Sequence, residues 1–350
     1  MTHRFGIVGS GMIAPVHLAA IRALPGAQAT GIMDHGSGHG KKLAPELDAT
    51  GCDDLDVFIA RDDIDIITVA TPSGLHYEAA LKAAQAGKHC IVEKPIDIQL
   101  SRIDEMISAH RHAGTLLGGI FNTRFSEAAQ LLKQASQSRR FGRLTFASAV
   151  GPWWRDQSYY DASAWKGTWA LDGGGALMNQ GIHSIDLLQW LVDSPVTSVS
   201  GRIATLAHEN VEVEDTGAAG LVFENGALGT IACTTSMWPG HFRTITLAGT
   251  EGTAVLGDAN LLVWQFRDEL PRDQGIRDRY LGLPGPGIGA SDPSAGLDCE
   301  GHKAAFAEFL AALESGRSPP IDGREARKAV STILAIYESA RLGGIPVAPG

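Results

Sequence analysis

A glycine-rich turn between an apolar strand and a helix is the feature that most constrains the fold of this chain. Arg4 to Val8 is a short apolar run, and Gly9-Ser10-Gly11-Met12-Ile13-Ala14 follows it directly. In a Gly-x-Gly-x-x-Ala turn the first glycine makes the bend, the second lets a pyrophosphate approach the backbone, and the small third residue lets helix and strand pack closely. The helix N-terminus then faces the anion. The turn therefore predicts a dinucleotide site, with a purely structural turn as the alternative.

An acidic residue follows the second expected strand. Ala27 to Met33 reads as a strand, and Asp34 comes at its end, twenty residues after Ala14, where a carboxylate accepts hydrogen bonds from ribose hydroxyls. A carboxylate repels a 2′-phosphate, and His35-Gly36-Ser37 offers no arginine, although Lys41 and Lys42 are near in sequence. The pattern favours NAD over NADP. The cofactor-binding residues expected here are Gly9, Ser10, Gly11, Met12, Ile13 and Asp34.

Strands and helices alternate through the first part of the chain. Expected strands at 64–70, 90–92 and 116–121 alternate with expected helices at 75–86 and from Ser101, capped with Asp104, to Gly114. This alternation is typical of a parallel sheet covered on both faces. We therefore predict an α/β protein with a Rossmann domain at residues 1–122.

The pattern changes to period two between about Leu144 and Phe266. Asn225-Gly226 lies between two apolar segments and predicts a two-residue hairpin. Helical patterns cover 183–192, 303–314 and 324–342, the last behind a capping box of Asp322 and Glu325. Residues 123–350 are thus expected to form an α+β domain with a large, mostly antiparallel open sheet. The loop Gly282–Gly296, rich in Gly, Pro and Ser, is expected at the surface, with a lid as one interpretation.

Composition excludes several classes of protein. The 350 residues carry 29 Lys+Arg and 39 Asp+Glu, a net charge of −10, which gives no general attraction for nucleic acid or anionic membranes. The sequence shows neither a basic segment followed by a long apolar one nor a run long enough to span a bilayer, so we expect a cytoplasmic protein. Four cysteines stand far apart, and no spacing of histidines and cysteines is typical of a metal site, so no metal is expected.

Two motifs fall just past the carboxyl ends of expected strands of the parallel sheet. One is Thr71-Pro72-Ser73-Gly74-Leu75-His76, and the other is Glu93-Lys94-Pro95. Ligands of open α/β sheets bind at that edge. We therefore assign Thr71, Pro72, Ser73, His76, Glu93 and Lys94 to the cofactor site.

These motifs, together with Gly173-Gly174-Gly175 and Gly181-Ile182-His183 followed by Asp186, resemble the Gfo/Idh/MocA family of sugar and polyol oxidoreductases. The resemblance implies a Rossmann domain followed by a mixed-sheet domain whose open face often supports dimers or tetramers. It also implies that Lys94 and Glu93 line the nicotinamide pocket, that the Lys94–Pro95 bond is cis, and that His183 is the acid/base partner. A homodimer or homotetramer is expected on this basis.

The chemistry of alcohol oxidation asks for the same types of group. A base must remove the hydroxyl proton while hydride leaves carbon, and a cation or donor must stand near the developing alkoxide. His183 and Lys94 supply these two types of group and are the expected catalytic residues. Asp186, three residues after His183, either orients the imidazole or is an ordinary first-turn acid.

Two positions depart from the family's pattern. Asn179 stands four residues before the histidine, where an aspartate is common, and an amide cannot act as a base. We therefore expect His183 to act as the base, with Lys94 as the alternative. Ser73 replaces the usual asparagine after Thr-Pro.

Tryptophans concentrate in the segment that leads to His183. Aromatic faces stack on sugar rings, and Arg155 and Lys166 are suited to a carboxylate or phosphate. The string from Tyr159 to His183 looks like the branch of the family that contains 3-dehydrogenases of UDP-N-acetylglucosaminuronate. We assign to the substrate Arg155, Trp165, Trp169, Asn179 and His183.

The sequence thus predicts an NAD-dependent oxidoreductase of a sugar, sugar acid, nucleotide sugar or polyol. Two other functions are kept open. One is an NAD-dependent glycosidase on the same fold, in which the cofactor is reduced and reoxidised within each cycle. The other is a non-catalytic regulator that senses sugar and NAD.

Overall fold

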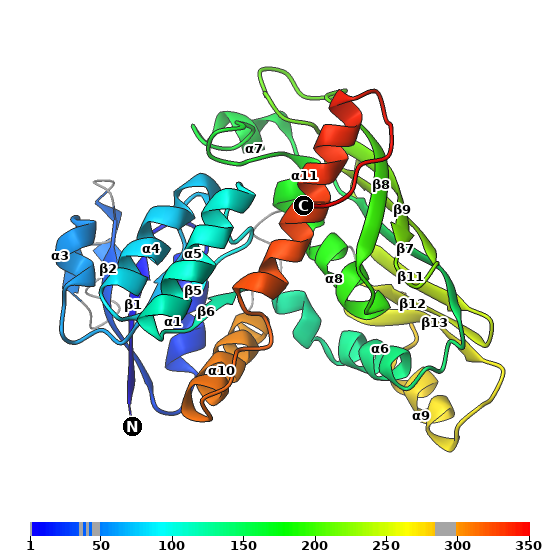
Figure 1. Ribbon diagram of the computed structural model, residues 1–350, viewed down its shortest axis with the longest axis horizontal. Helices are drawn as coiled ribbons and strands as arrows, with labels where there is room; N and C mark the ends of the chain where they lie inside the picture. The colour runs from blue at the N-terminus through cyan, green and yellow to red at the C-terminus, as the bar shows by residue number, and fades with distance from the viewer. Residues whose placement is uncertain (1, 35–37, 40–41, 44–49, 284–298) are drawn as a thin grey trace. The chain divides into compact units, whose positions relative to one another are not determined.

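The computed structural model describes residues 2–34, 38–39, 42–43, 50–283 and 299–350 (Figure 1). The chain divides into two compact units. The first is Met1–Asn122 with Leu297–Val330, and the second is Thr123–Gly296 with Ser331–Gly350. Most of the expected Gly282–Gly296 loop lies outside the described residues, so its interpretation as a lid stays a prediction.

A six-stranded parallel sheet forms the centre of the first unit. Its order is β3-β2-β1-β4-β5-β6, the doubly wound arrangement of a dinucleotide-binding fold. The strands are β1 (His3–Val8), β2 (Ala27–Met33), β3 (Thr50–Cys52), β4 (Ile66–Val69), β5 (His89–Val92) and β6 (Leu117–Gly119). All four residues of β4 are buried, as expected of a strand covered on both faces. The predicted fold class is confirmed.

The helices of the first unit begin and end close to the predicted positions. They are α1 (Ala14–Arg22), α3 (Leu55–Ile59), α4 (His76–Gln85), α5 (Leu100–Ala113), α10 (Glu300–Glu314) and the start of α11 (Gly323–Arg341). The predicted Ser101 cap of α5 is wrong, because the helix already begins at Leu100 and Gln99 is its N-cap residue. We did not predict β3 and α3, because both are too short to show a periodic pattern. The N-cap residue of α3 is Asp54, whose carboxylate accepts hydrogen bonds from two backbone amides.

Residues 297–330, which we had assigned to the second domain, cluster with the first unit. The physical reason is the apolar face of α10. Phe306, Phe309 and Leu310 are buried in the same core as Phe5 and Ile7 of β1. The rings of Phe5 and Phe306 stack with their centroids 5.8 Å apart. Chain order alone does not reveal this packing, because nearly three hundred residues separate α10 from β1, the strand that it covers.

A seven-stranded sheet forms the second unit, in the order β13-β12-β11-β7-β10-β9-β8. Every neighbouring pair is antiparallel except β10 and β7, so the sheet is mostly antiparallel, as predicted. Its strands are β7 (Leu144–Pro152), β8 (Val196–Ala204), β9 (Thr216–Phe223), β10 (Leu228–Thr234), β11 (Thr244–Gly249), β12 (Gly252–Gly257) and β13 (Asn260–Phe266). Burial alternates along β9 and β10, so one face of the sheet is covered and the other is open.

The turn between β9 and β10 differs from the predicted two-residue hairpin. The amide of Gly226 donates to the carbonyl of Phe223, and Gly226 has a φ of +84°. This geometry is a three-residue loop with a turn followed by a left-handed glycine. The Asn-Gly pair therefore marks the hairpin correctly. However, Gly226 is the last residue of the turn and not one of its two central residues.

Helices of the second unit include α8 (Ile182–Val192), preceded by the π-helical segment η3 (Ala176–Gly181). Its other helices are α6 (Glu127–Gln137), α7 (Gln157–Asp161), α9 (Pro271–Tyr280) and the end of α11. We did not predict α6, α7 or α9. In Figure 1, α8 lies across one face of the sheet, and no helix among the described residues of this unit covers the opposite face.

The packing of α10 generates the first prediction. Phe306→Ala should lower the free energy of unfolding by about 3–5 kcal/mol, because it empties a fully buried site against β1. Glu308→Ala, at an exposed position of the same helix, is the control and should change it by less than about 0.5 kcal/mol. Equal effects in denaturant unfolding would contradict the assignment of α10 to this core.

Candidate active site

The glycine-rich turn of the first unit has room for a ligand. Gly9 has a φ of +108°, and a Cβ there would lie 2.5 Å from the carbonyl oxygen of Ala70, so only glycine fits. Gly11 is exposed, and no described atom lies within 4 Å of the position its Cβ would take. A side chain at Gly11 would fill that open space. The turn therefore fits a dinucleotide whose pyrophosphate lies against the start of α1.

Asp34, the residue expected to bind a ribose, lies next to the glycine-rich turn. It follows β2, its backbone amide donates to the carbonyl of Cys52, and its side chain is almost fully buried. The neighbouring amide of Gly9 donates to the carbonyl of Met33, so the turn and the end of β2 are joined. Of the other residues predicted for this site, Ser10 and Ile13 are half-buried and Met12 is exposed.

His76 connects the two motifs that follow β4 and β5. Its Nδ1 lies 2.8 Å from the carbonyl oxygen of Pro95, and its Nε2 lies 2.9 Å from that of Thr71. Burial lowers the pKa of His76 more than these two carbonyls raise it. A neutral ring has one N–H, so it donates to one of these two carbonyl oxygens and lies in close contact with the other. The Thr71-Pro72-Ser73 loop and the Glu93-Lys94-Pro95 loop thus meet at His76. Ser73, at the start of the adjoining 3-10 turn, is buried.

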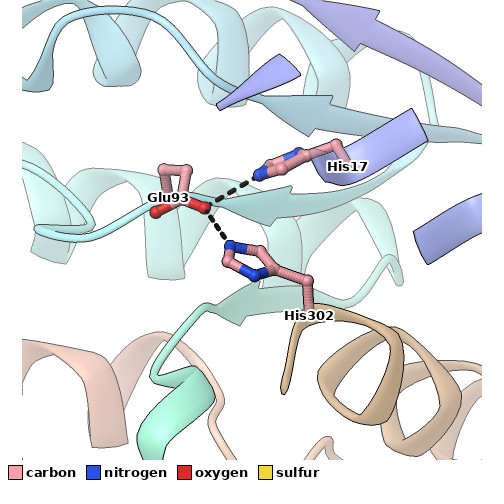
Figure 2. Close-up of side chains that lie close together, drawn as sticks. All are labelled: His17, Glu93 and His302. Carbon is pink, nitrogen blue, oxygen red and sulfur yellow. Dashed lines mark hydrogen bonds and ion pairs between the residues drawn. The ribbon is translucent and has the colours of Figure 1, made fainter. Parts of the chain in front are cut away.

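Glu93 and Lys94 are adjacent but differ in surroundings. Glu93 is buried, and its carboxylate is hydrogen-bonded to His17 of α1 and His302 of α10 (Figure 2). Lys94 is half-buried, and the bond between it and Pro95 is cis, as the resemblance implied. Sequence reasoning missed both histidines. No local spacing signals them, because His302 lies more than two hundred residues after Glu93.

A buried glutamate positions the backbone before His183 in the second unit. The carboxylate of Glu214 accepts hydrogen bonds from the amides of Gly175 (3.0 Å) and Leu177 (2.8 Å) and from the hydroxyl of Tyr337 (2.9 Å). Burial raises the pKa of Glu214 against the effect of these donors. Glu214 therefore ties the start of the π-helical segment to α11.

The glycines of this segment are required by contacts within the protein. A Cβ on Gly174 would lie 2.0 Å from the Tyr337 hydroxyl, and one on Gly175 would lie 1.9 Å from the carbonyl oxygen of Glu214. In the structure, these glycines let the chain pass close to Glu214 and Tyr337.

His183 is the second residue of α8 and is half-buried. Asn179, four residues earlier, lies in the π-helical segment and donates from Nδ2 to the carboxylate of Asp172 at 2.7 Å. A carboxylate can only accept, so this bond determines the amide orientation and turns the Asn179 carbonyl oxygen away from Asp172. The other oxygen of Asp172 accepts the amide of Gly167 at 2.9 Å.

Asp186 forms a buried ion pair with Arg124. Arg124 donates from Nε and one terminal nitrogen to the two carboxylate oxygens, at 2.7 and 2.5 Å. Both residues are almost fully buried. Asp186 thus takes part in a structural ion pair, which neither of the two sequence interpretations anticipated. Its effect is to anchor α8, the helix that carries His183.

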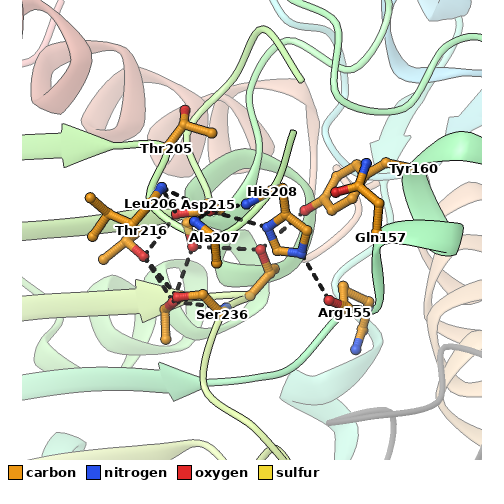
Figure 3. A network of polar contacts seen from close by, with 12 residues as sticks. Arg155, Gln157, Tyr160, Thr205, Leu206, Ala207, His208, Asp215, Thr216 and Ser236 are labelled. Carbon is orange, nitrogen blue, oxygen red and sulfur yellow. Dashed lines mark hydrogen bonds and ion pairs between the residues drawn. The ribbon is translucent and has the colours of Figure 1, made fainter. Parts of the chain in front are cut away.

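Arg155 is held by a polar network around Asp215 (Figure 3). Asp215 accepts the backbone amides of Leu206, Ala207 and His208 and also binds His208 Nδ1 at 3.1 Å. His208 Nε2 in turn lies 2.8 Å from the carbonyl oxygen of Arg155. Burial would raise the pKa of Asp215, but its backbone donors outweigh that effect and lower it. The Arg155 guanidinium lies over the rings of Trp153 and Tyr159.

The predicted aromatic residues differ in exposure. Trp169 is 42% exposed and meets Tyr337 edge to face, whereas Trp165 is half-buried. Lys166 places its ammonium group 3.7 Å from the centre of the Tyr159 ring. Trp169 is thus the tryptophan of this segment that offers the most accessible surface for stacking.

Both units of the chain match known protein families. Residues 3–120 match the oxidoreductase family with an NAD-binding Rossmann fold, and residues 129–255 match the GFO/IDH/MocA C-terminal domain. The crystal structure of the WlbA dehydrogenase from Bordetella pertussis, in complex with NADH and UDP-GlcNAcA, is 33% identical, with a TM-score of 0.88 over 99% of both chains. The chain belongs to the GFO/IDH/MocA family of NAD-binding oxidoreductases.

Curated relatives include further enzymes of the family. The 1,5-anhydro-D-fructose reductase of Ensifer adhaerens is 27% identical over 97% of both chains. The myo-inositol 2-dehydrogenase of Thermotoga maritima is 23% identical over 93% of both. These comparisons confirm the predicted cofactor, NAD, and the predicted enzyme class, an NAD-dependent dehydrogenase. Within the part of the chain that the structure describes, no helix is long and apolar enough to cross a membrane.

Asp97, just after the Glu93-Lys94-Pro95 motif, generates a prediction on pH. It is fully buried, and burial raises its pKa to about 6, against the hydrogen bond from the Gln99 amide and the charge of Arg102. The folded protein therefore holds the proton more tightly than the unfolded chain, and stability is lost as the pH rises from about 4 to about 6.

Asp97→Asn keeps the acceptor for Gln99 and removes the charge. Its gain in the free energy of unfolding should grow between pH 4 and pH 6 and then stay constant, on the order of 2 to 3 kcal/mol. Denaturant unfolding at pH 5 and pH 7.5 measures it, with the exposed Asp62→Asn as control. A gain that is equal at both pH values, or larger at pH 5, contradicts the prediction.

Proposed function

We propose that this chain oxidises a secondary hydroxyl of a sugar, sugar acid, nucleotide sugar or polyol and transfers the hydride to NAD. The observation that carries the proposal is a half-buried histidine, His183, at the start of α8, directly after a π-helical segment held by Glu214. Such segments are frequent at functional sites. The similarity to a dehydrogenase solved with NADH, along 99% of both chains, supports it.

In the proposed reaction His183 acts as the base. It accepts the proton of the substrate hydroxyl while the carbon that bears it loses hydride, so that the alcohol becomes a ketone. Bound NAD supplies the hydride acceptor. Lys94, carried by the loop after β5, donates to the substrate oxygen and stabilises the negative charge that develops there. Asn179 cannot take the proton, but its carbonyl oxygen is an acceptor for a second substrate hydroxyl.

A nucleotide sugar acid is the first substrate to test. The support is the similarity to the WlbA dehydrogenase, whose structure contains UDP-GlcNAcA, and the similarity of the string from Tyr159 to His183 to that branch. Under this proposal Trp165 and Trp169 contact the sugar ring and Arg155 the anionic group. The cofactor is held by the turn at Gly9, Ser10, Gly11, Met12 and Ile13, by Asp34, by the loop of Thr71, Pro72, Ser73 and His76, and by Glu93 and Lys94.

Release of NADH separates this function from its alternatives. A glycosidase that reduces and reoxidises its NAD in each cycle leaves no net NADH, and a non-catalytic regulator forms none. The wild-type protein should be incubated with NAD and a panel of UDP-GlcNAcA, free sugars, uronates and inositols. Stoichiometric NADH and ketone are expected from one of them. Bond cleavage without net NADH favours the glycosidase, and binding without turnover across the panel favours the regulator.

Substitution of the two proposed catalytic residues gives a prediction. Lys94→Ala and His183→Asn should each lower kcat by at least about 100-fold, because each removes a group that acts on the reacting oxygen. The affinity for NADH, measured by fluorescence titration, should change little, since the turn at Gly9 and Gly11 is intact. Substantial turnover in both variants would refute the assignment.

We also propose a homodimer or homotetramer formed through the open face of the second unit's sheet. Three exposed apolar side chains lie side by side there on neighbouring strands, because Leu228 of β10 pairs with Phe146 of β7 and with Val222 of β9. An apolar row of this kind is a surface that a second copy of the chain would cover.

Leu228→Glu should shift the mass measured by light scattering from the oligomer towards the monomer, because the charge would be buried without a partner. Leu206→Glu, at an exposed position outside the sheet, is the matched control and should leave the mass unchanged. A monomeric wild-type protein refutes the proposal directly.

A further inference from the structure

Glu93, His17 and His302 form a buried trio in the first unit (Figure 2). His17 Nε2 lies 2.8 Å and His302 Nε2 lies 2.9 Å from the same oxygen, Oε1 of Glu93. The three residues come from α1, from the end of β5 and from α10, so one carboxylate oxygen links three elements of the unit. The sequence analysis did not predict that these three residues would be hydrogen-bonded to one another.

The trio has the composition of a metal site, and its three ligand atoms lie within 4.8 Å of one another. Its distances are nevertheless those of hydrogen bonds. Two ligands of a tetrahedral zinc ion, each about 2.0–2.1 Å from the metal, are about 3.3 Å apart. The two nitrogen-to-oxygen distances of 2.8 and 2.9 Å are shorter, so each nitrogen shares a proton with the carboxylate.

The donors and acceptors of the trio are consistent with two neutral imidazoles and one carboxylate. A carboxylate only accepts, so both Nε2 atoms carry the hydrogen. His17 Nδ1 is then an acceptor, and the hydroxyl of Thr68, 2.8 Å away, is its donor. Burial lowers the pKa of His17, which keeps the ring neutral. Burial also works to raise the pKa of Glu93, but the two histidine donors outweigh it and hold that pKa well below its usual range.

The second oxygen of Glu93 accepts the backbone amide of Lys94 at 3.0 Å. One oxygen of the carboxylate is thus bonded to α1 and α10, and the other oxygen is bonded to the backbone of Lys94. The carbonyl oxygen of Pro95, the next residue, lies 2.8 Å from Nδ1 of His76. The loop that carries Lys94 is therefore held at both ends by buried side chains, and the bond at its Glu93 end depends on how the two histidines orient the carboxylate.

We propose that His17 and His302 are positioning residues that act through Glu93 to place Lys94 for the reaction. The inference rests on the proposed function of Lys94. It makes α10, which lies outside the residues matched to the NAD-binding family, a working part of the cofactor unit. His302 needs no contact with substrate or cofactor for this role.

Two substitutions of His302 test whether its N–H donor, rather than the size of its side chain, is what matters. His302→Leu removes the donor, whereas His302→Gln returns an amide N–H at about the same reach. Glu93→Gln leaves one amide oxygen to accept three N–H groups, so at least one of these bonds is lost. His110→Gln is the matched control, because His110 is also a buried histidine of this unit but bonds to Thr115 and Ala80. Thr68→Val, a milder change, removes only the donor to His17.

Turnover at saturating NAD and substrate is the first measurement. Glu93→Gln and His302→Leu should each lower kcat by about 100-fold, the cost of a small misplacement of a reacting group. His302→Gln should recover most of that loss, and His110→Gln should match the wild type in kcat. Because both histidines act through one carboxylate, the double variant Glu93→Gln/His302→Leu should be no slower than Glu93→Gln alone.

The position of Lys94 can be followed without turnover. In protein whose lysines carry ¹³C-methyl groups, the Lys94 signal is identified by its loss in Lys94→Arg. It should shift in His302→Leu, return in His302→Gln and stay in place in His110→Gln. If the wild type forms no NADH on the panel, the proposed function fails while these shifts still decide the positioning role.

Three results would overturn the inference. One is a wild-type kcat and an unmoved Lys94 signal in His302→Leu. Another is a double variant whose loss is the product of the single losses, since the residues would then act independently. The third is a rise of the unfolding temperature with Zn²⁺ in the wild type that is absent from His302→Leu, which would make the trio a metal site.

Discussion

A carboxylate buried away from water must find hydrogen-bond donors, and this requirement organises both units of the protein. Glu93 takes its donors from two helices and from the backbone of Lys94. Glu214 takes them from the segment before His183 and from Tyr337. Asp215 takes them from three successive amides and from His208. Glu93 and Glu214 thereby join segments that are distant in sequence, whereas Asp215 fixes the nearby turn that carries His208.

The residues of the proposed reaction come from both units. The first carries the residues that fit NAD, together with Lys94, and the second carries His183 and the aromatic segment before it. Within each unit the proposed catalytic side chain is half-buried, while the groups that hold its backbone are buried. Such an arrangement keeps the reacting groups accessible and leaves their supports little freedom, as preorganised sites require.

The glycine-rich turn between β1 and α1 could be predicted because its determinants are local. Gly9, Gly11 and Ala14 act on their own turn, and Asp34 comes at the end of the next strand, so spacing alone locates them. The hairpin at Asn225-Gly226 was likewise visible, although its three-residue geometry was not. His17 and His302 were missed because no periodicity connects them to Glu93. The glycines before His183 were correctly singled out, but their reason lies in Glu214 and Tyr337, which are distant in sequence.

By itself the sequence determined the alternation of elements, the parallel and antiparallel halves, the dinucleotide turn and the family resemblance, because all of these follow from patterns between near neighbours in the chain. Only the tertiary structure decided that α10 covers β1 and that Asp186 pairs with Arg124. It also decided which side chains hold Lys94 and the segment before His183. The physical reason is that burial and hydrogen bonding depend on distance in space, and residues far apart in sequence supply the partners.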